Sequence, residues 1–142
     1  MYFSRSLEEL HPRVAKKARA LIVCCAEEDI DLVVTCTYRD LEAARALYAM
    51  GRKKAGKVTH IALRADYHQW RMAFDVYPVR YGMPVWSGEH TMDNRLFRKI
   101  GEMGKALGLE WGGDWRPYRR ELWHFQLTEG LTIAELERGK TL

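Results

Sequence analysis

The sequence lacks any apolar run long enough to cross a membrane. Its longest apolar stretch, residues 20–26, is far shorter than the roughly 20 residues that a membrane-spanning helix needs. Residues 1–6 also lack the basic start, the apolar stretch and the small-residue cleavage site of a secretion signal. We therefore expect no integral membrane association, and synthesis in the cytoplasm without a signal peptide.

Internal repeats, low-complexity tracts and linkers rich in proline or serine are also missing. The chain has 142 residues, which is an ordinary size for one domain. A chain of this length buries about 68–70% of the surface of its unfolded form, so it needs no disulfide for stability. We predict that residues 1–142 form a single domain, without a separate wall-anchoring or DNA-binding module.

Cysteine is scarce, and its pattern argues against a disulfide framework. There are three cysteines, Cys24, Cys25 and Cys36, and the first two are adjacent in an apolar run. An odd number of cysteines in this arrangement is typical of proteins made in a reducing compartment. We interpret the thiols as small buried hydrophobic groups.

No block of five or six like charges is present, and the net charge is a mild +4, from 23 basic and 19 acidic residues. Such an excess favours association with polyanions in general, which include nucleic acids and bacterial wall polymers. The basic residues are spread among acidic ones and form no known nucleic-acid-binding motif. We therefore predict no nucleic-acid partner.

The apolar periodicity predicts helices first and then a small sheet. Asp40 and Asp93 are expected to cap the second and third helices, Thr132 is expected to cap a short last one, and residues 52–70 read mostly as a loop. This order favours an α+β fold with a small, mainly antiparallel sheet and helices packed against it. The predicted helices cover residues 12–28, 40–51 and 93–107, and the predicted strands residues 31–37, 72–78, 109–111 and 122–127.

Four polar residues are candidates for chemistry because two of them interrupt apolar strands. Asp75 and His124 lie within such strands, His68 precedes Asp75 by seven positions, and Glu121 precedes His124 by three. Each alone has an ordinary explanation, such as a hydrogen-bonded core histidine or a carboxylate paired with an arginine. Together they favour a divalent metal, because unpartnered buried carboxylates and imidazoles are costly. Two imidazoles and one carboxylate leave a fourth position open on Zn²⁺, as a catalytic site requires, and a nearby carboxylate can then move protons.

The sequence motifs around these residues resemble those of the M15 family of zinc peptidases. The resemblance covers most of the chain, from about Leu10 to Leu127. This family includes D-alanyl-D-alanine carboxypeptidases, the dipeptidases of vancomycin resistance and phage endolysins that cut L-alanyl-D-glutamate bonds. The motifs that carry it are TCTYR (35–39), LYAMGR (47–52), GKVT (56–59), HQWRMAFDVYP (68–78), LGLEWGGDW (107–115) and ELWHF (121–125).

The resemblance implies a role for each matching residue. Zn²⁺ would be held by His68, Asp75 and His124, and Glu121 would be the catalytic carboxylate. Arg39 would hold the substrate carbonyl and stabilise the oxyanion, although it could instead pair with Asp40 on the surface. The expected substrate contacts are Tyr38, Asp66 and Trp115.

Two positions depart from the family pattern, since Asp66 stands where Ser is usual and Arg71 where Gly is usual. The remaining histidines, His11, His60 and His90, are interpreted as solvated or capping residues.

These features lead to one main hypothesis about function and two alternatives. The main one is a monomeric endopeptidase of the endolysin type that hydrolyses the stem peptide of bacterial peptidoglycan, at the L-alanyl-D-glutamate bond. It would act on the wall after release, in phage lysis. The first alternative is a D-alanyl-D-alanine carboxypeptidase or dipeptidase, which the sequence Glu121-Leu-Trp-His124 favours. The second is a non-catalytic binding module that keeps zinc for structure alone.

Overall fold

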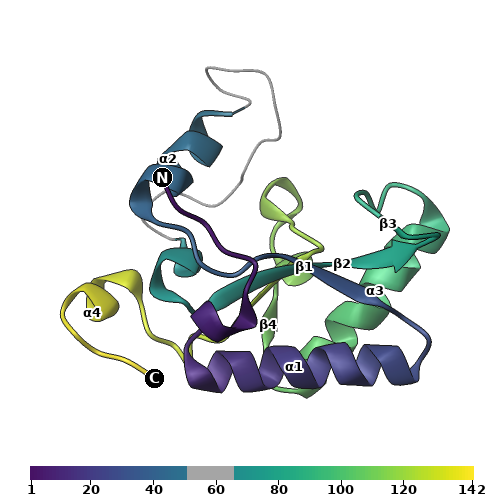
Figure 1. Cartoon of the computed structure of the whole chain (residues 1–142), viewed down its shortest axis with the longest axis horizontal. Helices are drawn as coiled ribbons and strands as arrows, with labels where there is room; N and C mark the ends of the chain where they lie inside the picture. The colour runs from purple at the N-terminus through teal and green to yellow at the C-terminus, as the bar shows by residue number, and fades with distance from the viewer. Residues whose placement is uncertain (51–65) are drawn as a thin grey trace.

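The computed structural model describes residues 1–50 and 66–142, and this part folds into an antiparallel sheet with helices packed against it (Figure 1). Helix α1 runs along one side of the sheet, whereas α2 lies on the other side (Figure 1). The predicted α+β class is therefore confirmed. The α-helices are α1 (Pro12–Glu27), α2 (Leu41–Ala49), α3 (Thr91–Ala106) and α4 (Ile133–Glu137), and the strands are β1 (Leu32–Cys36), β2 (Ala73–Arg80), β3 (Met83–Pro84), β4 (Glu110–Trp111) and β5 (His124–Gln126).

Strand β2 is the centre of the sheet. The strand order is β1-β2-β5-β4, with β3 pairing with one end of β2, and the pairs are antiparallel. Short 3₁₀ helices connect these elements: η1 (Leu7–Glu9), η3 (Tyr67–Trp70), η4 (Gly112–Asp114) and η5 (Pro117–Arg119). As a result, β1 and β5 both place side chains beside those of β2.

The helix starts follow mostly from capping side chains. Pro12 opens α1 after His11, whose Nδ1 accepts a hydrogen bond from the backbone amide of Arg13, so the capping interpretation of His11 is confirmed. Asp40 caps α2 and Thr132 caps α4, both as predicted. Helix α2 ends at Ala49, slightly earlier than expected.

Two predictions about local structure need correction. Helix α3 begins at Thr91 with His90 at its N-cap, so Asp93 is not the cap; its carboxylate accepts a hydrogen bond of 2.8 Å from Nη1 of Arg80 instead. The predicted loop over residues 52–70 ends in the 3₁₀ helix η3. Residues 51–65, which include His60, the last two residues of the motif at 47–52 and the whole motif at 56–59, lie outside the described part of the chain.

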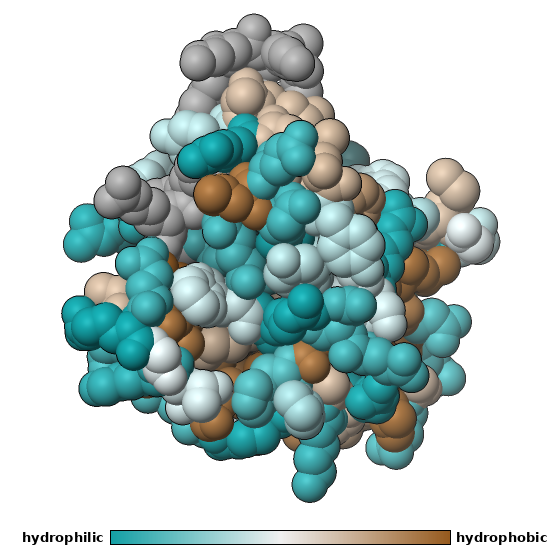
Figure 2. All heavy atoms as spheres, turned by 60° about the vertical axis from the view of Figure 1, so that its left-hand side comes forward, coloured by the Kyte–Doolittle hydropathy of each residue, from teal (hydrophilic) through white to brown (hydrophobic). Residues whose placement is uncertain are grey.

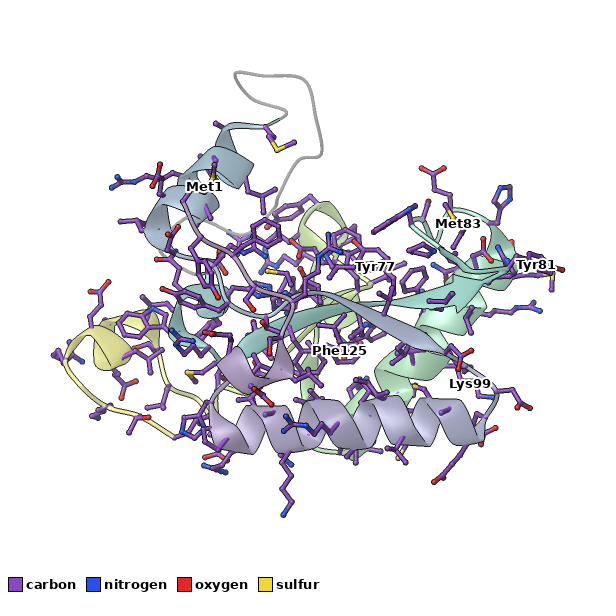
Figure 3. All side chains as sticks on the ribbon, viewed as in Figure 1. Met1, Tyr77, Tyr81, Met83, Lys99 and Phe125 are labelled. Atoms are coloured by element: carbon purple, nitrogen blue, oxygen red, sulfur yellow. The ribbon has the colours of Figure 1, made fainter. Side chains whose placement is uncertain are left out.

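The core lies between α1, α3 and one face of β2. Side chains alternate along residues 72–77 as in any strand, so that Met72, Phe74 and Val76 are buried in this core together with α1. Phe125 lies on the α1 side of the sheet, whereas Tyr77 lies on the opposite side (Figure 3). The opposite face of β2 therefore carries Ala73, Asp75 and Tyr77.

The cysteines form no disulfide, as predicted, and Cys25 and Cys36 are buried. On the face shown in Figure 2, hydrophobic residues form small separate patches among hydrophilic ones. None of the helices in the described residues is long and apolar enough to cross a membrane.

Candidate metal centre

The register of the sheet brings the candidate residues together around Asp75. In the antiparallel pairing of β2 with β5, Asp75 stands opposite His124. In the pairing of β1 with β2, Cys36 stands opposite the same Asp75. Side chains directly opposite each other share one face of a sheet, with Cβ atoms about 4.5–5.5 Å apart. The three side chains therefore gather on the face of β2 that points away from α1.

A bulge in β1 decides which residue of that strand reaches Asp75. Val34 pairs with Val76, but the next pair is Cys36 with Asp75, so Thr35 is the extra residue. Regular pairing would have placed Thr35 there. Bulges of this kind turn side chains toward active sites.

His68 approaches the cluster from η3, the short helix before β2. The Asp66 carboxylate caps η3 by accepting a hydrogen bond of 2.9 Å from the backbone amide of His68. Arg71 ends η3 with a φ of 62°, a left-handed conformation that favours glycine. This left-handed backbone explains why glycine is usual at the position of Arg71 in the family motif. The Arg71 side chain packs over the Tyr38 ring at 4.0 Å and pairs with Glu9, contacts that help to hold the strained backbone.

Two ring nitrogens face one oxygen of Asp75. Nε2 of His68 and Nδ1 of His124 each lie 3.2 Å from Oδ1 of Asp75. Both histidines are fully buried, and Asp75 is buried as well. The two imidazole rings lie edge to face with their centroids 5.1 Å apart. Two imidazole nitrogens and a carboxylate, which are common metal donors, thus meet at Oδ1 of Asp75.

The other nitrogen of each ring faces a hydrogen-bond acceptor, which fixes the tautomer of the neutral ring. Nδ1 of His68 lies 3.1 Å from the carbonyl oxygen of Thr37, which can only accept a hydrogen bond. Nε2 of His124 lies 2.9 Å from Oε1 of Gln126, and the amide of Gln126 donates to Glu110 at 2.8 Å. Because a carboxylate accepts that amide proton, Oε1 of Gln126 must face His124. When the rings are neutral, as metal ligation requires, Nε2 of His68 and Nδ1 of His124 are thus the nitrogens that carry lone pairs toward Asp75.

Glu121 and Arg39 complete the cluster as a carboxylate and a cation. Oε1 of Glu121 lies 3.9 Å from Nδ1 of His124, and its buried Oε2 has no hydrogen-bond partner. Burial raises the pKa of Glu121 above its ordinary value. Arg39 is buried and lies 3.6 Å from Asp66 and 3.5 Å from Asp75, so the alternative of a surface pair with Asp40 is wrong.

The charges at the centre are strongly coupled. Burial disfavours the charged form of His68, but Asp75 outweighs this effect and holds the pKa of His68 well above its ordinary value. Burial alone would raise the pKa of Asp75, yet His68 and His124 hold it well below the ordinary value. Similarly, Asp66 and Asp75 outweigh the effect of burial and raise the pKa of Arg39.

The donor set fits a divalent metal ion such as Zn²⁺. Nε2 of His68 is buried and makes no well-formed hydrogen bond, although it points into the cluster beside Asp75. A metal ion would be shared by this nitrogen, by Nδ1 of His124 and by the Asp75 carboxylate. Glu121 lies next to these donors, at a position from which it can exchange protons with a substrate.

The predicted substrate contacts lie at different places around this centre. The Trp115 ring packs against His124 with a centroid distance of 5.0 Å. Asp66 caps η3 and pairs with Arg39, which gives it a structural role. Tyr38 packs against Tyr2 and Arg71.

Sequence reasoning missed Cys36 as part of this centre. Its Sγ atom, a ligand atom of His68 and one of Asp75 all lie within 4.8 Å of one another. The available signal was its position three residues before Arg39, in the same motif. Gln126 and Glu110 were also missed, and their signal was the placement of Gln126 two residues after His124, on the same face of the strand.

Comparison with known proteins identifies the family of the chain. A model of the M15 peptidases, described as D-alanyl-D-alanine carboxypeptidase, matches residues 64–127. The peptidoglycan L-alanyl-D-glutamate endopeptidase CwlK of Bacillus subtilis (strain 168) is 32% identical over 116 residues, in a match that covers 78% of this chain and 70% of that protein.

Two solved structures share the fold. The L-Ala D-Glu endopeptidase ChiX of Serratia marcescens aligns with a TM-score of 0.65 and 21% identity, covering 89% of each chain. The vancomycin resistance D,D-pentapeptidase VanY, solved in complex with Zn(II), aligns with a TM-score of 0.60 and 16% identity, covering 95% of this chain and 88% of that one. Together with the similarity to CwlK and the match to the family model, these findings show that the chain belongs to the M15 family of metallopeptidases.

Proposed function

We propose that this protein is a zinc peptidase that hydrolyses the L-alanyl-D-glutamate bond in the stem peptide of bacterial peptidoglycan. The observation that carries the proposal is Oδ1 of Asp75, which has a ring nitrogen of His68 and one of His124 at 3.2 Å each. A buried carboxylate, Glu121, lies beside His124. Three donors with an adjacent acid–base group are the parts that hydrolysis at a metal requires.

Each residue has a distinct part in the reaction. Zn²⁺ would supply a Lewis acid that polarises the scissile carbonyl and makes water more acidic. Glu121 takes a proton from the water that attacks the carbonyl carbon, and then gives it to the nitrogen as the C–N bond breaks. The raised pKa of Glu121 favours this return step. Arg39 provides a permanent positive charge for the oxygen that becomes negative.

The choice of bond is supported by the similarity to CwlK and ChiX, both described as endopeptidases for this linkage. We propose that the protein acts as a monomeric endolysin, which reaches the wall during phage lysis. A catalytic role fits better than a purely structural zinc site, because a structural site needs neither Glu121 nor Arg39.

A second candidate reaction is removal of a terminal D-alanine. It is favoured by the description of the family model and by the fold shared with VanY, which has also been solved with D-alanine-D-alanine. The two reactions differ in the products they leave, because one cuts inside the stem peptide and the other only shortens its end.

Mass spectrometry of digested peptidoglycan fragments tests the proposal. We expect a free N-terminal D-glutamate on the released peptide, and no product when a chelator is present. The matched control is Glu121→Ala at the same metal content, which should leave the fragments intact. Loss of D-alanine alone would favour the carboxypeptidase, and cleavage that is insensitive to chelation would refute the zinc mechanism.

A further inference from the structure

Cys36 lies inside the candidate metal centre rather than in the apolar core. The bulge in β1 places it opposite Asp75, and its Sγ atom lies within 4.8 Å of ligand atoms of both Asp75 and His68. Its side chain is buried, with a relative exposure of 9%. A thiol held this close to a carboxylate and an imidazole is in reach of any ion that they bind.

The surroundings of Cys36 differ from those of the other buried thiol. Cys25 packs in the core of α1 against Met103, and burial raises its pKa to about 11, as expected for an inert cysteine. Cys36 is instead surrounded by the charged or polar groups of Arg39, His68 and Asp75.

A second observation points to a ligand at the same place. Nε2 of His68 is fully buried and makes no well-formed hydrogen bond, although it lies 3.2 Å from Oδ1 of Asp75, beside Cys36. Such a nitrogen is costly unless it is paired. This nitrogen and the thiol therefore face the same point beside Asp75.

We propose that Cys36 is a fourth protein ligand of the metal, which it binds through Sγ in the resting enzyme. The inference rests on the metal centre of the proposed function and extends it from two nitrogens and an oxygen to a set that includes sulfur. Binding transfers the thiol proton to solvent and forms the metal–thiolate bond. Sulfur makes the site more selective for soft ions such as Cd²⁺. A thiolate ligand would take the position that hydrolysis needs for water, so Cys36 has to leave the metal before the reaction.

Cobalt spectroscopy of the full chain tests this assignment directly. The apoprotein, prepared with a chelator, is loaded with Co²⁺, whose d–d bands in the visible region report binding. A thiolate ligand adds a charge-transfer band in the near ultraviolet. We expect this band in the wild type and in the control Cys24→Ser, and its loss in Cys36→Ser with the visible bands retained. Circular dichroism confirms that each variant is folded.

The outcomes separate this inference from the proposed function. Visible bands without the charge-transfer band in the wild type would show a metal centre that Cys36 does not join, and this result needs no variant. No cobalt binding at all would overturn both the centre and the thiolate. A charge-transfer band that survives in Cys36→Ser would assign it to another cysteine. If Cys36→Ser does not fold, Cys36→Ala serves as the second variant.

Discussion

Glu121 illustrates how one side chain combines burial with chemistry. Its carboxylate is buried beside His124, yet one of its oxygens has no hydrogen-bond partner. Such a group destabilises the fold slightly while it is ionised, because burial raises its pKa. A position of this kind is best explained by a role in catalysis rather than in folding.

Replacing Glu121 should therefore remove activity but not the metal or the fold. For Glu121→Gln, which keeps the shape of the side chain, we expect turnover to fall by about 10²–10⁴-fold, the usual contribution of a general acid–base group. The melting temperature should stay the same or rise, because a buried charge is removed. Metal analysis and thermal melting accompany the kinetic assay. Loss of metal in this variant would make Glu121 a ligand instead.

Arg39 should affect both stability and rate. The role in oxyanion stabilisation concerns the rate, but the guanidinium also lies between Asp66 and Asp75, where it holds two buried carboxylates. In Arg39→Ala, two buried carboxylates lose a partner, which costs about 3–5 kcal/mol for a buried pair. Turnover should also fall, by about 10²–10³-fold. Arg39→Lys keeps the charge but not the planar fork, so it should restore stability more fully than turnover. Urea unfolding and kinetics together check this expectation, and a fully stable Arg39→Ala would contradict it.

At the scale of elements, strand pairing rather than sequence spacing decides what belongs to the site. The alternation of side chains in residues 72–78 places Asp75 on the face opposite the core, and the pairing of β2 with β5 places His124 beside it. Cys36 could not be recognised in this way, because regular alternation would put Thr35 opposite Asp75. The bulge that reverses this choice has no signature in the apolar pattern.

Hydrogen bonds from β5 and the residues just after it hold the His124 ring in place. Thr128 and Gln126 both donate to Glu110 on β4, and Gln126 accepts from His124. Outer partners of this kind typically contribute about 10–100-fold to metal affinity. We expect Gln126→Leu to weaken metal binding by this amount, whereas Glu110→Gln, which still accepts from Gln126, should have a smaller effect. Titration against a competing chelator measures the metal affinity of both variants. Equal affinities for Gln126→Leu and the wild type would show that Gln126 does not contribute to metal binding.

Helix α3 approaches the sheet closely through glycine. A Cβ atom at Gly104 would lie 2.4 Å from the Phe125 ring, next to His124. Overpacking a core costs about 1–3 kcal/mol, which exceeds the gain of up to about 1 kcal/mol in helix propensity. Gly104→Ala should therefore lower the melting temperature. An increase in melting temperature would mean that Phe125 has room to move.

At the scale of the whole molecule, the sequence was sufficient for the fold class and most helix starts, because capping residues and apolar periodicity act locally. The prediction from the sequence was wrong at the start of α3. Asp93 does not cap this helix but forms an ion pair with Arg80 of β2. A long-range pair of this kind leaves no trace in local sequence. The same limit applies to Gln126 and Glu110, whose roles depend on two strands that meet only in the fold.

Metal and proton compete for the same centre, so the stability of the whole protein should depend on both. In the metal-free protein the pKa of His68 is raised, and its contribution to stability is complete below about pH 6.5 and lost as the pH rises through the folded-state pKa. The pKa of Asp75 is lowered, and its contribution is present above about pH 3.9 and lost only as the pH falls through its folded-state value.

The metal-free protein should therefore be most stable between these limits and should weaken at alkaline pH. A metal-bound His68 is already neutral, so the loaded protein does not lose this contribution, and metal binding tightens as the proton leaves. The difference in melting temperature between zinc-loaded and chelator-treated protein should thus grow from pH 6 to pH 8. Melting curves at fixed free zinc measure this difference in melting temperature. In the control His68→Ala, the difference should depend much less on pH. A difference that stays constant or shrinks with rising pH would show that His68 carries no proton for the metal to displace.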